Sequence, residues 1–240
     1  MQPRETVAIR NLSDRFFSQI SVAVLFLAAA LLPSLRVSIA ATPIPQEDVL
    51  SRPATIGDRS LPASSAFEEA LQVSGIPGGA ALVEGCADEP QPTVHPYGTT
   101  LREVLDSITS RDSHYMWRMH EGVVNLEPVK GAPALLRMLL KTYDSGNLTD
   151  AASAVMFLSS LPEVARAAAG LGLTHNALGP GLGGIAPGPP SPKKPLGVRL
   201  HDVTLLDALN AIARTNKHGV WIYSETHCGS VHQFIVYFQQ

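Results

Sequence analysis

The sequence predicts an α+β protein made of two related small units, each with amphipathic helices packed on a small mixed sheet. Residues 94–117 recur as residues 198–221, with 7 of 24 aligned positions identical, where average composition gives roughly one or two by chance. Each copy also places an apolar stripe at helical spacing before a short strand-like segment, so the repeat indicates duplicated βαββ-type structure. The recurring positions expected to define the fold are Thr100, Leu101, Leu105, Ile108 and Trp117, and again Thr204, Leu205, Leu209, Ile212 and Trp221.

Residues 1–40 have the pattern of a signal peptide. Arginines precede the apolar run of 13 residues, Ile20–Leu32, and small residues at Ser38 and Ala40 match what signal peptidase reads. A helix of that length spans about 20 Å, less than the roughly 30 Å hydrocarbon core of a bilayer. An uncleaved anchor is the alternative, but it would place Arg36 in the bilayer. We predict cleavage after Ala40 and an exported protein, periplasmic or secreted, with no transmembrane segment in the mature chain.

The charge balance of the mature chain argues against nucleic-acid binding. Four of the 18 basic and two of the 21 acidic residues lie in residues 1–40, which leaves 14 basic and 19 acidic residues and a net charge of −5. Nucleic acid requires a concentrated basic face, and no stretch of the mature chain supplies one. Residues 41–62 contain four prolines and are expected to form a flexible tether.

The first unit is expected to span residues 63–128. Ser65 and Thr100 each begin a capping-box spacing, in which the hydroxyl and a glutamate three residues later satisfy N–H groups of the first helical turn. Glu121-Gly122 suits the two-residue turn of a tight hairpin. The expected elements are a helix from Ser65, a strand over residues 80–83, a helix from Thr100, and hairpin strands over residues 115–120 and 123–126.

The second unit is expected to span residues 132–240. Residues 135–143 fit either a strand or a helix, and we favour a strand. A Pro/Gly-rich insertion over residues 174–197 is expected to be disordered. Thr204 with Asp207 begins the helix equivalent to the one at Thr100. The other expected elements are helices over residues 149–160 and 162–169, a strand over residues 198–200, and hairpin strands over residues 220–223 and 234–238, joined by a long turn over residues 224–231.

Three groups of residues in the first unit carry a family likeness. These are the break Gly75-Ile76-Pro77, the helix entry formed by Gly98 and Leu101, and the closing hairpin over residues 115–126. On these residues the unit resembles the short N-terminal domain (STN domain) shared by secretins and TonB-dependent receptors, and the second unit resembles only its closing half. In that family the domain is non-enzymatic and makes protein contacts in the periplasm. The resemblance therefore implies a stand-alone exported bacterial protein bearing this module.

The cysteines and histidines are the candidate chemical groups. Export would allow a disulfide between Cys86 and Cys228, and the alternative is two buried free thiols. His227, Cys228 and His232 are near neighbours and could hold zinc, whereas the simpler interpretation is a pair of exposed loop histidines. His114 and His218 occupy equivalent positions, either as paired ligands or pH sensors, or as imidazoles that favour a helix C-terminus.

The function expected from the sequence is protein-protein interaction or assembly in the cell envelope, without catalysis. No Gly-x-Ser-x-Gly or nucleotide-binding loop occurs, so we expect no catalytic residue and no cofactor. The partner is expected to be an envelope protein or a second copy of the chain, which could add a strand at Val83 or at residues 234–238. The alternative is an exported protein that binds a metal or small ligand through the region of His227, Cys228 and His232.

Overall fold

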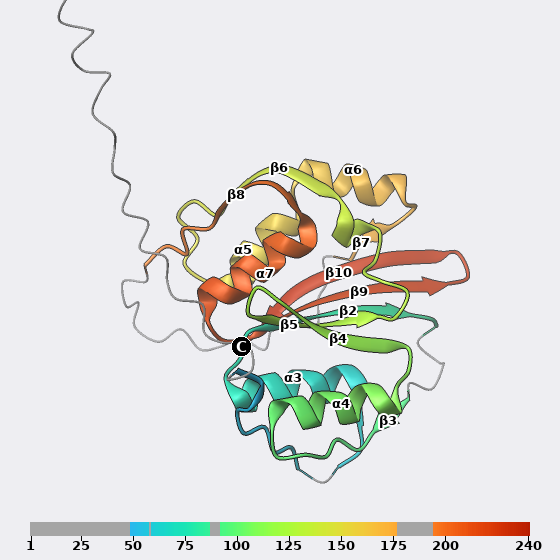
Figure 1. The fold of residues 1–240 in the computed structure, drawn as a ribbon. Coiled ribbons are helices and arrows are strands. Elements are labelled where there is room, and N and C mark those ends of the chain that lie inside the picture. The colour runs from blue at the N-terminus through green and yellow to red at the C-terminus, as the bar shows by residue number, and fades with distance from the viewer. Residues whose placement is uncertain (1–48, 58, 87–91, 177–193) are drawn as a thin grey trace, which may run out of the picture. The chain divides into compact units, whose positions relative to one another are not determined.

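A computed structural model describes residues 49–57, 59–86, 92–176 and 194–240 of the chain. Its main sheet contains strands β2 (Gly78–Glu84), β4 (Tyr115–His120), β5 (Val123–Pro128), β7 (Thr174–His175), β9 (Val220–Cys228) and β10 (Val231–Gln239). The six strands lie in the order β4-β5-β2-β9-β10-β7 (Figure 1). β2 is parallel to both of its neighbours, whereas the hairpins β4–β5 and β9–β10 are antiparallel.

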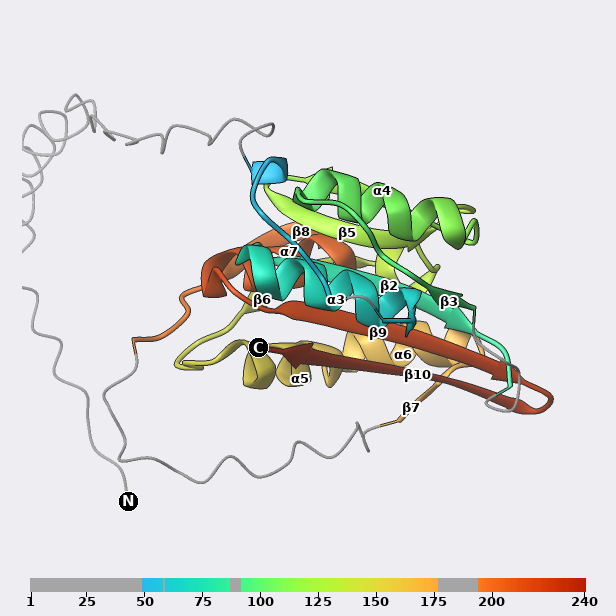
Figure 2. The ribbon, with the colours of Figure 1, turned by 90° about the horizontal axis from the view of Figure 1, so that it is seen from below.

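Helices cover both faces of this sheet. α3 (Ala63–Ser74) and α4 (Leu101–Arg111) lie on one face, and α5 (Ala151–Ser159), α6 (Pro162–Gly170) and α7 (Leu205–Asn216) lie on the other (Figure 1 and Figure 2). Alternate residues of β2 therefore enter different hydrophobic cores: Ala80 and Leu82 pack with α3 and α4, and Ala81 packs with α7. Burial on both faces explains why this strand is apolar without alternation.

Strands from the two predicted units join in this one sheet. β9, from the second unit, pairs with β2, from the first, over the register Gly78↔Val220 to Glu84↔Thr226. The α+β class is confirmed, but strands of the two units lie side by side in one sheet and not in two separate sheets. All described residues belong to one compact unit, so the segments 63–128 and 132–240 are halves of one fold. Pairing the halves buries strand edges that each would otherwise expose.

The duplicated helices begin as the capping boxes predict. Thr100 with Glu103 caps α4, and Thr204 with Asp207 caps α7, with both reciprocal hydrogen bonds present at each helix. The apolar stripes are buried at every position that the repeat marks, which are Leu101, Leu105, Ile108, Leu205, Leu209 and Ile212. The spacing within each copy therefore predicts the buried face of its helix correctly, although the two helices lie on opposite faces of the sheet.

The two tryptophans make equivalent hydrogen bonds to their own helices. The indole Nε1 of Trp117 donates to Asp106 Oδ1 at 2.8 Å, and that of Trp221 donates to Asn210 Oδ1 at 2.9 Å. Both bonds span 11 residues and join a helix to the strand that follows it. Trp221 is fully buried, while Trp117 is half-buried at the edge of the sheet. Each tryptophan thus packs as part of the fold and fixes its helix on the sheet.

Because Trp221 is more deeply buried than Trp117, removing its hydrogen-bond acceptor is expected to lower the free energy of unfolding more. Asn210→Ala is expected to lower the free energy of unfolding by about 2 kcal/mol, because it leaves the buried indole N–H of Trp221 without a partner. Asp106→Ala is expected to cost less than about 1 kcal/mol, because water can replace the acceptor at Trp117. Urea unfolding of the two variants measures both values. Equal losses would contradict the assignment of Trp221 to the dry core.

The expected flexible tether is wrong for its second half. Leu50, Ala54 and Ile56 are buried in the core with α3 and α4. The backbone of this segment is held as well, since Leu101 N–H donates to the Arg52 carbonyl at 2.8 Å. Apolar residues spaced through a proline-containing segment provide a surface to bury, which composition alone does not reveal. Residues 41–48 and the expected signal peptide, residues 1–40, lie outside the described residues.

The second hairpin is longer than predicted. Residues 224–228 continue β9 and residue 231 begins β10, so a two-residue turn, Gly229-Ser230, replaces the expected eight-residue loop. Residues 224–228 instead alternate between the two faces of a continuous strand. The predicted strand boundaries were therefore wrong by five residues at the end of β9 and by three at the start of β10.

The remaining elements largely follow the expectation. α3 begins at Ala63 after Pro62, without a side-chain cap, so the predicted capping box at Ser65 is wrong. A short 3-10 helix, Leu135–Arg137, precedes β6 (Leu139–Asp144), which pairs with β8 (Arg199–Thr204). β1 (Leu61–Pro62) pairs with β3 (Thr93–Val94). Of the expected insertion over residues 174–197, the first two form β7, and residues 177–193 lie outside the described part of the chain.

Candidate functional site

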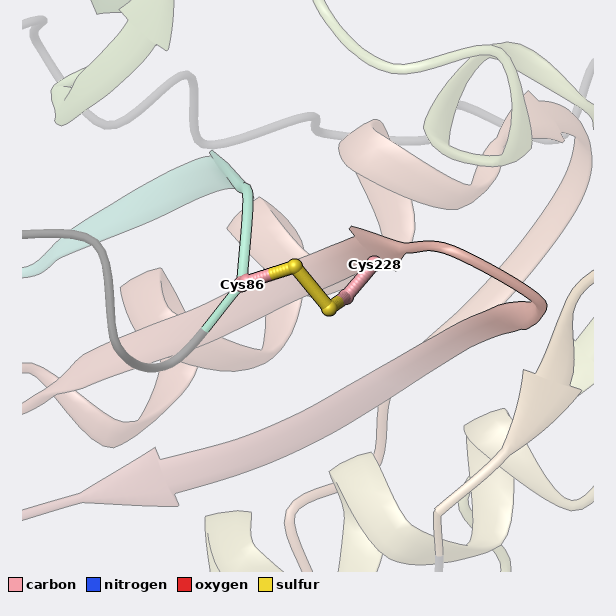
Figure 3. The surroundings of a disulfide bond; sticks show 2 residues. All are labelled: Cys86 and Cys228. Atoms are coloured by element: carbon pink, nitrogen blue, oxygen red, sulfur yellow. A yellow bond between two sulfur atoms is a disulfide. The ribbon is translucent and has the colours of Figure 1, made fainter.

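A disulfide links the end of β2 to the β9–β10 hairpin. Cys86 follows β2 and Cys228 ends β9, and their Cα atoms are 4.7 Å apart (Figure 3). The bond confirms the disulfide alternative and joins the two predicted units. It also removes Cys228 from the candidate zinc ligands, because a disulfide sulfur is not the thiolate that zinc requires. Among the described residues no group of three or more His, Cys, Asp or Glu side chains could hold a metal ion.

A chain of polar contacts runs along the same hairpin, from the core to the surface. Tyr223, Glu225 and His227 alternate along β9, so their side chains share one face of the sheet. The Tyr223 hydroxyl donates to Glu225 Oε1, and Glu225 Oε2 lies 3.1 Å from His227 Nε2. His227 Nδ1 then lies 3.0 Å from Nδ1 of His232, its cross-strand partner. The first two side chains are buried and the two histidines are exposed.

The order of these contacts determines which imidazole nitrogen carries a proton. Burial, foremost, and the hydrogen bond with Glu225 raise the pKa of Tyr223 far above its usual range, so its hydroxyl remains a donor. Glu225 accepts from that hydroxyl, and a carboxylate also accepts from a protonated Nε2 of His227. A neutral His227 with its proton on Nε2 has a lone pair on Nδ1, and this lone pair faces His232.

A cleft of about 470 Å³ lies at the carboxyl end of β2, on the face covered by α3 and α4. Ligands of open parallel sheets commonly bind at the carboxyl ends of strands. Neither Lys nor Arg occurs among the described residues that line it, whereas Glu84 and Asp112 contribute carboxylates. Burial is the main reason that the pKa of Tyr115 is raised, a backbone hydrogen bond with Val83 opposes this, and Asp112 and Glu84 add to the rise. The Tyr115 phenol therefore remains neutral within an acidic cleft.

His114 and His218, which occupy equivalent positions in the repeat, lie at opposite ends of α3. His114 lines the cleft, where its Nδ1 lies 2.8 Å from Asp112 Oδ1. The imidazole of His218 lies beside Gly75, the residue that ends α3. Twelve helical residues separate these places, a distance of about 18 Å. The two histidines therefore do not form a paired ligand set.

The outer edge of β4 presents free backbone groups. Glu121 and Gly122 both have positive φ, 50° and 81°, as a two-residue hairpin turn requires. The residues that flank such a turn, His120 and Val123, exchange hydrogen bonds, so alternate β4 residues point their backbone groups away from β5. These outward residues include Trp117 and Met119, whose backbone N–H and C=O groups have no hydrogen-bond partner among the described residues.

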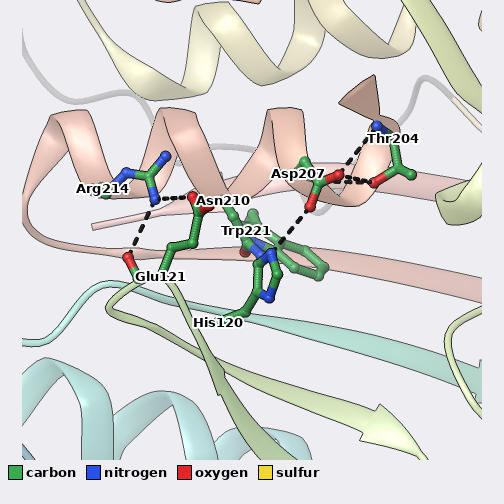
Figure 4. Close-up of polar contacts among 7 residues, drawn as sticks. All are labelled: His120, Glu121, Thr204, Asp207, Asn210, Arg214 and Trp221. Atoms are coloured by element: carbon green, nitrogen blue, oxygen red, sulfur yellow. Dashed lines mark hydrogen bonds and ion pairs between the residues drawn. The ribbon is translucent and has the colours of Figure 1, made fainter. Parts of the chain in front are cut away.

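Side chains of α7, in the second unit, contact the tip of the β4–β5 hairpin, in the first unit. Arg214 donates to the Glu121 side chain at 2.6 Å and to its backbone carbonyl at 3.2 Å (Figure 4). His120 Nε2 lies 3.3 Å from Oδ1 of Asp207, whose other oxygen caps the helix at Thr204. Contacts at the tip of the hairpin therefore fix the direction of β4 and leave its outer edge open. Both contacts are solvent-exposed, and the Arg214–Glu121 ion pair contributes little to stability alone.

Sequence reasoning located some of these features and missed others. It identified His227, His232 and the cysteines but missed Tyr223 and Glu225, although their alternation with His227 was the available signal. Of the expected edges, Val83 lies in β2, an interior strand, while residues 235–238 lie in β10 beyond its short pairing with β7. Within the described residues, no helix combines the length and apolar character needed to cross a membrane.

Comparison of the chain with family models, with curated proteins and with solved structures finds no match.

Proposed function

We propose that this chain is an exported, non-enzymatic interaction module of the cell envelope, and that the edge of β4 binds an extended segment of a partner protein. The observation that carries the proposal is the row of outward backbone groups at Trp117 and Met119. An extended peptide can pair with such an edge through its main chain and gain specificity from alternate side chains. Soluble domains usually cover or blunt an edge strand of this kind, so an open one marks a site for a partner.

Charges beside β4 define the partner's chemistry. Arg118 forms no ion pair with any described residue, and its guanidinium contacts the Met116 sulfur at 3.3 Å. Arg102 lies over the Trp117 ring, with its Cζ 5.8 Å from the centroid. The two arginines come from a strand and a helix that border the same edge. A partner strand with acidic side chains fits this edge better than a basic one.

Export is supported by two independent features. The disulfide between Cys86 and Cys228 belongs to the class of bond that persists in oxidising compartments and is rare in the cytosol. The basic, apolar and small-residue order of residues 1–40 is that of a signal peptide. The resemblance to the STN domain adds a third argument, because that domain makes protein contacts in the periplasm.

Substitution of Met119 tests the edge directly. Met119→Pro removes an outward N–H that the sheet does not use, and the proline ring obstructs an added strand. Met119→Ala removes the same side chain but keeps the N–H and is the matched control. We expect a partner captured from the envelope fraction of source cells, then purified, to bind Met119→Ala about as well as the wild type. It should bind Met119→Pro at least about tenfold more weakly, as expected when strand pairing is lost.

The same pair of variants separates a foreign partner from a second copy. Sedimentation of the mature chain measures self-association, and a dimer dispersed by Met119→Pro but kept by Met119→Ala would make the partner strand β4 of another molecule. Circular dichroism and urea unfolding confirm that both variants fold. Binding that is equally strong for both variants would exclude the β4 edge as the site.

A further inference from the structure

We propose that His227 and His232 bind a divalent transition-metal ion through their Nδ1 atoms, at the tip of the β9–β10 hairpin. This site is distinct from the β4 edge and does not depend on the proposed partner. It uses two of the three residues of the alternative that the sequence left open and excludes Cys228, which is in the disulfide. The ligand class follows from the donors, because imidazole nitrogen suits zinc and copper and suits calcium or magnesium poorly.

The hairpin places the two donors at chelating distance. The turn Gly229-Ser230 makes Cys228 and Val231 its hydrogen-bonded pair, so His227 and His232 form the next, non-hydrogen-bonded pair. Side chains of such a pair are the closest in an antiparallel sheet. The two Nδ1 atoms are 3.0 Å apart. Tetrahedral zinc with Zn–N bonds of about 2.0–2.1 Å needs them roughly 3.3 Å apart, so a small rotation of the rings is enough.

The carboxylate of Glu225 favours the tautomer of His227 that can bind a metal through Nδ1. Metal-bound histidines usually donate their second ring N–H to a carboxylate, which fixes the tautomer and makes the ligand more basic. Glu225 Oε2 occupies that position, 3.1 Å from His227 Nε2, and the Tyr223 hydroxyl holds the other oxygen of the carboxylate. His227 therefore needs no change of tautomer to bind the metal through Nδ1. At His232 the Nδ1 proton moves to Nε2 of the exposed ring, so Nδ1 can bind the metal.

The backbone on both sides of the site is held in place. Cys228, next to His227, is linked to Cys86, which fixes the end of β9. The Thr174 hydroxyl donates to the His232 carbonyl at 3.0 Å, from β7 on the other side of β10. A preorganised pair of donors loses less conformational entropy on binding than the same pair on a mobile loop. Water completes the coordination, so the ion should be exchangeable and not a structural ion.

Titration of tag-free mature protein with Zn²⁺ tests the site. Calorimetry is expected to give one site per chain. His232→Ala should weaken binding at least about tenfold, because one of two protein ligands is lost, and Glu225→Gln should weaken it about tenfold through the lost support of His227. The matched control is His201→Ala, an exposed histidine of the same unit, which should bind Zn²⁺ like the wild type.

A second measurement identifies the nitrogen atoms. The imidazole ¹⁵N resonances of His227 and His232 should shift on Zn²⁺ addition at Nδ1, while His201 should not respond. Circular dichroism confirms that each variant folds, which is expected because both histidines are exposed. Absence of binding at millimolar Zn²⁺, or equal binding by the wild type and His232→Ala, would overturn the proposal.

Discussion

Replacing Cys86 and Cys228 together by serine is expected to lower the free energy of unfolding by about 4 to 5 kcal/mol, because loop-closure entropy grows with the length of the closed loop. The bond closes a loop with a sequence separation of 142 residues. It also joins the two units beside the parallel pair β2 and β9. Both positions are partly exposed, so the serine hydroxyls can be solvated and the main change is the lost cross-link. Urea unfolding, extrapolated to water, measures the difference.

Chemical reduction of the wild type is the control for the cysteine variant. Reduced wild type and the double serine variant should unfold at closely similar urea concentrations, because both lack the same cross-link. A decrease in the free energy of unfolding below about 1 kcal/mol would mean that contacts between the two units persist in the unfolded chain. The disulfide would then add little constraint to that chain. The single variants Cys86→Ser and Cys228→Ser should match each other, since either one breaks the same bond.

Gly79→Ala is expected to destabilise the protein by about 3 kcal/mol, the upper part of the usual range for overpacking a core. A Cβ atom at this position would lie 1.8 Å from Cε2 of Trp221, the residue directly opposite on β9. The indole cannot easily move away, because it is buried and donates to Asn210. Gly170→Ala is the matched control: a Cβ there meets nothing within 4 Å, and alanine favours the helical residue. Urea unfolding compares the two.

A double-mutant cycle shows whether the clash is with Trp221. Trp221→Leu is itself destabilising, but it removes the ring that a Cβ at position 79 would meet. In that background Gly79→Ala should cost less than about 1 kcal/mol, so the two substitutions should be strongly coupled. Independent effects would show that Gly79 is required for some other reason, such as its backbone conformation.

Local features of the fold were predictable because they depend on neighbouring residues. The capping boxes at Thr100 and Thr204 satisfy helix N–H groups within four residues, so their spacing is visible in the sequence. The turn at Glu121-Gly122 is of the same kind. The capping box at Ser65 failed because the chain enters α3 two residues earlier, where Pro62 fixes the backbone and β1 pairs with β3.

The candidate sites were only partly predictable, for a reason visible in β9. His227 and His232 were identified as neighbours in sequence, but residues 224–231 were expected to be a turn and not strand. In a strand the same residues alternate, so Tyr223 and Glu225 share a face with His227, and this depends on strand pairing. The open edge of β4 could not be predicted either, because the order of strands decides which of them has one neighbour.

Residue spacing within short segments was enough to establish the duplicated helices, their buried stripes, the first hairpin and the α+β class. Long-range packing added that β2 of the first unit pairs with β9 of the second, and that α4 and α7 cover opposite faces of one sheet. That pairing brings Cys86 to Cys228, places Trp221 over Gly79, and leaves β4 at the edge. Such contacts join segments up to 142 residues apart, and no local pattern encodes which segments meet.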